Sequence, residues 1–131
     1  MSWDADLISA VPEHLVGAYP CTGSWNYTHN TNEMIASALY DIGVGDAFTS
    51  GSGPLGSAIG PTWWKRLDGC DGATGAKFLT DLIVQLDSEP ARYRAMNPPN
   101  GWGSYDTLLP VLREMLLASL TEVPSTWLVS G

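Results

Sequence analysis

The second half of the chain carries two apolar stripes at helical spacing, which constrain the fold more than any other feature. The first stripe consists of Phe78, Leu79, Leu82, Ile83 and Leu86. The second consists of Leu108, Val111, Leu112, Met115 and Leu116. Because residues at i, i+3 and i+4 share one face of a helix, each stripe predicts an amphipathic helix that must bury that face.

Flanking residues predict where these helices begin. Asp71 or Thr74 is expected to cap the first one, and Pro90 is expected just inside a short helix that follows it. Ser104 or Asp106 is expected to start the last helix, after a turn cluster that no regular element would tolerate.

A further helix is predicted in the first third of the chain, from Ile35, Ala38, Leu39 and Ile42. Asn30 with Glu33 three residues later is typical of a capping box, and Thr31 or Asn32 are alternative caps. Between Gly43 and Gly72 the chain is rich in glycine and serine without periodicity. This stretch is interpreted as a long loop insertion, functional or mobile.

Two short segments near opposite ends have strand composition: residues 24–28, SWNYT, and residues 126–130, TWLVS. They are expected to pair in one sheet, which must pack against the helices because a two-stranded ribbon is marginal alone. The prediction is a single α+β domain over residues 1–131. It has a small two-stranded or few-stranded sheet packed against about three amphipathic helices.

The composition of the chain limits the classes of molecule that it is expected to bind. With 14 acidic and 6 basic residues the net charge is −8, which disfavours nucleic acids and anionic membranes as partners. No apolar run approaches the roughly 20 residues that span a bilayer, and the acidic N-terminus is unlike a secretory signal. A cytoplasmic protein is expected. The two cysteines and two histidines lack metal-ligand spacing, so neither a metal nor a cofactor is expected.

Rings and amides gather at two predicted helix starts, in GSWNYTHNTNEM (residues 23–34) and NGWGSY (residues 100–105). Amides donate and accept, rings stack on planar groups, and a helix N-terminus favours an anion. Arg92 or Arg94 would neutralise phosphate. These features suit a nucleotide-like small molecule. The candidate ligand-binding residues are Trp25, Asn26, Thr28, His29, Asn30, Trp63, Trp64, Arg92, Asn100, Gly101, Trp102 and Tyr105.

Structural interpretations compete with these assignments. Trp102 is interpreted first as the cap of the core in a structural turn. One of Trp63 and Trp64 is expected to fill a gap in the core while the other lies on the surface, rather than both closing over a ligand. His29 is expected to bond the backbone more readily than to act as an acid or base.

Two elements resemble a family of small proteins encoded by phages and bacteria. The first element comprises Thr28, His29, Asn30 and Met34, and the second comprises Asn100, Gly101, Trp102, Gly103 and Tyr105. The resemblance covers both ends of the chain and implies a phage-type protein acting in the host cytoplasm.

The leading hypothesis is therefore a binding protein that sequesters a nucleotide-derived immune signalling molecule and so acts as an anti-defence sponge. One alternative is a protein–protein interaction module, a homo-oligomer or an inhibitor of a host protein. A further alternative is a small hydrolase that acts on such a signal, with His29 as acid or base.

Overall fold

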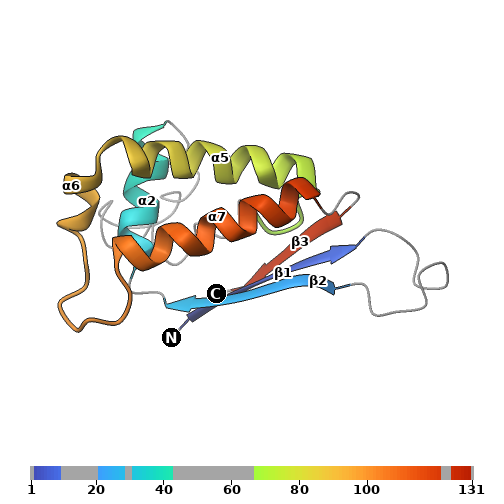
Figure 1. Cartoon of the computed structure of the whole chain (residues 1–131), viewed down its shortest axis with the longest axis horizontal. Helices are drawn as coiled ribbons and strands as arrows, with labels where there is room; N and C mark the ends of the chain where they lie inside the picture. Colours follow the sequence, from blue (N-terminus) through green and yellow to red (C-terminus); the bar gives the residue numbers. More distant parts are fainter. Residues whose placement is uncertain (1, 10–20, 29–30, 43–66, 122–124, 131) are drawn as a thin grey trace, which may run out of the picture.

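The protein has an α+β fold, shown by a computed structural model that describes residues 2–9, 21–28, 31–42, 67–121 and 125–130 (Figure 1). The elements in chain order are β1 (Ser2–Ser9), β2 (Cys21–Thr28), α2 (Asn32–Asp41), α5 (Gly72–Ser88), α6 (Pro90–Arg94), α7 (Tyr105–Thr121) and β3 (Ser125–Ser130). The helices predicted from apolar spacing are all present, as are the two predicted strands.

The sheet is three-stranded and antiparallel, in the order β2-β1-β3. The expected direct pairing of the two predicted strands is wrong, because β1 lies between them and pairs with both. Ala5 is opposite Trp25 on one side and opposite Val129 on the other. Along β1, Trp3, Ala5 and Leu7 are buried and alternate with aspartates, as expected for a strand with one covered face.

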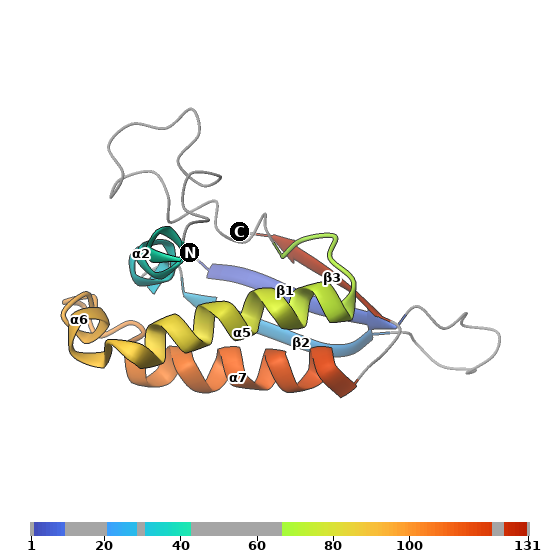
Figure 2. The same cartoon turned by 90° about the horizontal axis from the view of Figure 1, so that it is seen from above.

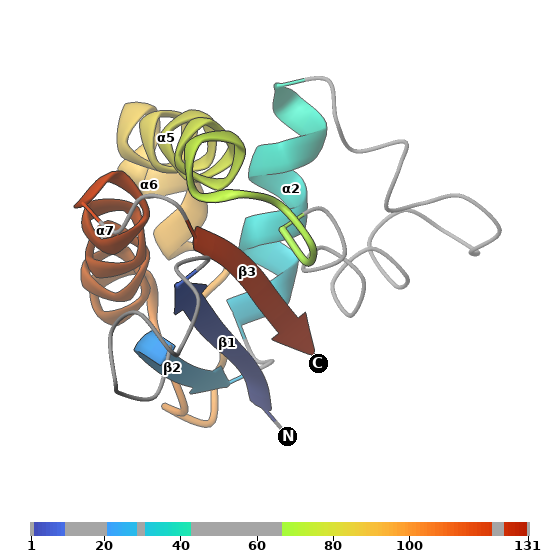
Figure 3. The same ribbon diagram turned by 90° about the vertical axis from the view of Figure 1, so that its right-hand side faces the viewer.

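The described helices form one layer on one side of this sheet, which is clearest in the end-on view of Figure 3. Helices α5 and α7 lie side by side along the sheet (Figure 2). At one end, the Ser119 hydroxyl of α7 donates to the Gly72 carbonyl of α5 over 2.5 Å and accepts from Trp127 Nε1 of β3 over 3.1 Å. This buried network fixes both helices to the sheet.

The core fills the space between the two layers. The two predicted stripes supply most of its helical half, and Trp3 and Trp127, both fully buried, supply the sheet half. Phe78, Val111 and Leu116 are only partly buried at its margin. Removing this apolar surface from water is the main favourable contribution to folding.

Local signals place the helix starts as predicted in two cases. Asp71 caps α5 by accepting from the Thr74 N–H over 2.7 Å, and that hydrogen bond lowers the pKa of the Asp71 carboxyl. Pro90 occupies the start of α6. For α2 the cap position is Thr31, which was one of the predicted alternatives, whereas Asn30 lies outside the described residues.

The end of the glycine-rich stretch is anchored against β3. The Gly69 N–H donates to the Trp127 carbonyl and the Trp127 N–H donates to the Cys70 carbonyl, each over 2.8 Å. The Val129 N–H donates to Asp68 Oδ1 over 2.9 Å. Residues 43–66, the larger part of the predicted insertion, lie outside the described residues. In the described part of the chain, no helix has the length and apolar character to cross a bilayer.

Candidate functional site

The two ring-rich elements, about 75 positions apart in sequence, meet in space at the start of α7. Tyr27, near the end of β2, accepts from the Ser104 N–H over 3.3 Å and donates to the Ser104 carbonyl over 3.4 Å. Its hydroxyl also forms a short hydrogen bond with Thr107 Oγ1. The Tyr27 hydroxyl therefore joins the first element to the end of the second.

The loop before α7 has a fixed conformation. Asn100 Oδ1 accepts from the Trp102 N–H over 2.9 Å, and Asn97 Oδ1 accepts from the Tyr105 N–H over 2.8 Å. Gly101 and Gly103 have φ of 75° and 90°, values that only glycine adopts without strain. The hydrogen bonds explain the short amides of this segment, and the positive φ angles explain its glycines.

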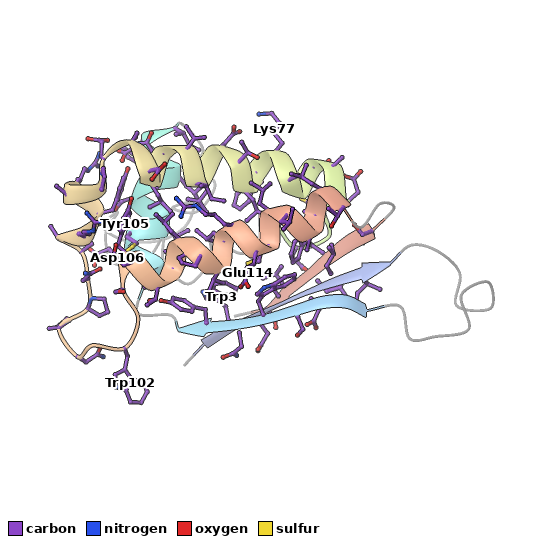
Figure 4. The ribbon with its side chains drawn as sticks, viewed as in Figure 1. Trp3, Lys77, Trp102, Tyr105, Asp106 and Glu114 are labelled. Atoms are coloured by element: carbon purple, nitrogen blue, oxygen red, sulfur yellow. The ribbon has the colours of Figure 1, made fainter. Side chains whose placement is uncertain are left out.

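Trp102 is 71% exposed and points away from the helix layer, beyond the level of the sheet (Figure 4). The interpretation of Trp102 as a cap of the core is therefore wrong. The loop conformation that Gly101 and Gly103 permit turns the indole outward.

Tyr105 is buried instead. Its hydroxyl donates to the Leu86 carbonyl over 2.7 Å, and the Arg94 guanidinium lies 4.9 Å from the centre of its ring. Burial raises the pKa of the Tyr105 hydroxyl, and the nearby Asp87 carboxylate adds to the shift. Tyr105 therefore contributes a ring to the wall of a site rather than a free hydroxyl.

A cavity of about 220 Å³ opens beside this ring, between the end of α5, α6 and the first half of α7. It is lined by Asp87, Pro90, Arg94, Tyr105, Asp106, Leu109, Pro110 and Arg113. We call it the three-helix pocket. Figure 4 shows Tyr105 and Asp106 together at this end of α7.

The charges of the three-helix pocket form two pairs. Arg94 Nη2 lies 2.8 Å from Asp106 Oδ1, and Arg113 Nη2 lies 3.6 Å from Asp87 Oδ1. All four side chains are at least half exposed. The hydrogen bonds to Asp106 raise the pKa of Arg94, so this guanidinium stays charged.

Three other candidate residues lie elsewhere. Trp25 packs on Trp127 on the helix-covered face, with ring centres 5.5 Å apart. Asn26 is on the opposite face and donates to Asp4 Oδ1 over 2.6 Å. Arg92 pairs with Asp41 of α2 over 2.7 Å, apart from the three-helix pocket. The structure thus brings Tyr105 and Arg94 together but leaves these three outside that pocket.

Four candidates, His29, Asn30, Trp63 and Trp64, lie outside the described residues, and Thr28 is described only as the last residue of β2. Their proposed roles, including the acid or base role of His29, stay predictions. Within the described ranges, no three His, Cys, Asp or Glu side chains are grouped to hold a metal ion.

Sequence reasoning missed most of the three-helix pocket. Asp87 and Arg113 are on different helices, and no spacing rule connects them. An α-helix turns by about 100° per residue, so two residues that are two positions apart differ by about 200° around its axis. Arg92 and Arg94 therefore point to different sides of α6. That geometry separates the two arginines, which the sequence left as alternatives.

A scan of the chain against models of known protein families matched none, and searches of curated proteins and of solved structures likewise found no match.

Proposed function

We propose that this protein binds a small nucleotide-derived signalling molecule in the three-helix pocket and sequesters it without converting it. The observation that carries the proposal is the charge pattern of the pocket. Arg94 and Arg113 supply planar donors that suit phosphate. Asp87 and Asp106 supply acceptors for the hydroxyls of a ribose.

The existing ion pairs do not prevent such binding. Because their side chains are at least half exposed, water and salt screen each pair, and its contribution to stability is small. A phosphate that receives two N–H groups of one guanidinium forms a stronger charge-assisted contact. An incoming ligand therefore replaces the carboxylate partners at small cost, although the net charge of −8 opposes any anion at long range.

The pocket size sets how much of the ligand it encloses. Drug-sized ligands occupy pockets of roughly 300–1,000 Å³. At about 220 Å³ the three-helix pocket lies below this range, so it would hold only one part of a dinucleotide-sized ligand. The remainder of the ligand would extend along the surface.

We also propose that the bound molecule is an immune signal. This proposal is supported by the resemblance to phage and bacterial proteins and by the small size of the chain. A protein that only withholds a molecule needs a binding pocket and no catalytic groups. In this setting the protein would act in the cytoplasm of the infected host.

The proposal predicts that Arg113→Gln weakens binding of ADP-ribose, used as a probe, about tenfold, which corresponds to about 1.4 kcal/mol. Arg94→Gln should have a similar effect. Lys77→Gln is the matched control, because Lys77 is in another exposed ion pair, with Asp81 on α5, and does not line the pocket. Isothermal titration calorimetry measures the affinities.

Chromatography of the ADP-ribose recovered from the same samples then tests for conversion. Failure of the wild-type protein to bind any ribose phosphate, or equal losses in all three variants, would contradict the proposal. Recovery of a cleaved probe would favour the hydrolase instead.

A further inference from the structure

The loop over residues 95–104 presents the most exposed of the large apolar side chains in the described part of the chain, Trp102 at 71%. We call this segment the Trp102 loop. The other tryptophans of known placement are buried or half-buried against the core. Exposed indole surface is unfavourable in water, and tryptophan is the residue type most enriched at the energetic centres of protein interfaces.

The Trp102 loop is held in place before any partner arrives. The Gly101 N–H donates to the Pro98 carbonyl over 3.4 Å, and Asn100 accepts from the Trp102 N–H. Tyr27 and Asn97 fix the start of α7 behind it. A preorganised anchor loses little conformational entropy on binding, so more of its contact energy appears as affinity.

The same segment is free of charge. From Ala95 to Tyr105 no residue is acidic or basic, although the chain as a whole is 15% charged. Depletion of charged residues distinguishes the buried centre of protein interfaces from the rest of a protein surface. In its lack of charge and in its exposed tryptophan the loop therefore resembles an interface centre.

The sheet supplies charge on the side toward which Trp102 points, away from the described helices (Figure 4). The face of the sheet opposite the described helices carries Asp4 and Asp6, which accept from neutral groups, Asn26 Nδ2 and the Ser24 hydroxyl, each over 2.6 Å. The four described cations all pair with other carboxylates. Within the described ranges, both carboxylates therefore lack a cationic partner.

We infer that the Trp102 loop and the face of the sheet opposite the described helices form a docking surface for a basic protein partner. Its surface would have an apolar slot for the indole and lysines or arginines around that slot. A second copy of this chain fits less well, since each copy carries a net charge of −8 and the two would repel. Anionic membranes are disfavoured for the same reason.

The test begins with photo-crosslinking in the cells that naturally express the chain. A photoreactive phenylalanine replaces Trp102 in one sample and Lys77 in a control sample, and adducts specific to position 102 are identified by mass spectrometry. The identified protein is then purified, and its affinity is measured for the wild type, Trp102→Ala, Trp102→Phe and the double variant Asp4→Asn/Asp6→Asn.

We expect Trp102→Ala to weaken binding by at least roughly tenfold, and Trp102→Phe to retain part of the affinity. The aspartate variant should slow association and reduce its salt dependence. Melting curves check that all variants are folded. The inference is overturned if no protein adduct depends on position 102, if the adduct is another copy of this chain, or if Trp102→Ala binds the partner normally. It is also overturned if the loop binds lipid vesicles of phosphatidylglycerol instead.

Discussion

At the scale of single residues, the Tyr27 hydroxyl connects parts of the chain that are distant in sequence. It contacts both the backbone of Ser104 and the side chain of Thr107, so it orders the start of α7 against the end of β2. The Trp102 loop ends at this point. The hydroxyl thus positions the loop as well as the helix.

Replacing Tyr27 with phenylalanine should lower the free energy of unfolding by about 1 kcal/mol, because the Ser104 N–H loses one of its acceptors. Urea denaturation measures the change. Tyr40→Phe, at an exposed position of α2, is the matched control and should leave stability unchanged. Equal stability of the wild type and the Tyr27 variant would show that this contact contributes nothing.

Residue type alone does not predict burial here. Trp3 and Trp127 are fully buried, whereas Trp102 is the most exposed of the large apolar residues described. Trp3 alternates with polar residues along β1, which is visible in the sequence, whereas Trp127 is followed by Leu128, and only the alternating burial along β3 shows its side. Trp102 is oriented by two glycines with positive φ, which the sequence marks as a turn without giving the direction of the side chain.

At the scale of elements, tertiary packing against β3 outweighs intrinsic helix propensity at one position of α5. Gly75 is in the interior of this helix, where alanine would be favoured by about 1 kcal/mol on propensity alone. A Cβ at Gly75 would lie only 2.5 Å from atoms of the Trp127 ring. That ring is fully buried and bonded to Ser119, so it cannot move aside easily.

Gly75→Ala should therefore destabilise the protein by about 1 kcal/mol or more, because overpacking a core costs about 1–3 kcal/mol. Thr80→Ala, on the exposed side of the same helix, should give a small gain instead. Thermal or urea denaturation of both variants measures whether each is less or more stable than the wild type. A stabilised Gly75 variant would contradict the tight packing between α5 and β3.

Helices with a strong periodicity of apolar residues could be predicted from the sequence, whereas the pairing of the strands could not. The helices followed from stripes such as Leu79, Leu82 and Leu86, which the core buries. The strand β1 was missed because aspartate is depleted in strands, although Trp3, Ala5 and Leu7 alternate with Asp4 and Asp6. Which strand lies at the centre depends on long-range pairing, which no local pattern encodes.

At the scale of the whole molecule, the three-helix pocket exists only because three helices converge. Its two ion pairs join residues 12 and 26 positions apart, between elements whose crossing the sequence does not specify. The ring-rich elements, by contrast, were recognisable from composition, and the Tyr27 contacts bring them together. The sequence therefore indicated a region near the start of α7 and, of the residues that line the pocket, only Tyr105 and the alternative Arg94.

Native mass spectrometry of the protein mixed with lysate from phage-infected cells shows whether the protein retains a small nucleotide-derived molecule. We predict an added mass of one such molecule, which survives desalting, is released unchanged by heat and is reduced in Arg113→Gln. No added small mass, or release of that molecule in cleaved form, would contradict sequestration.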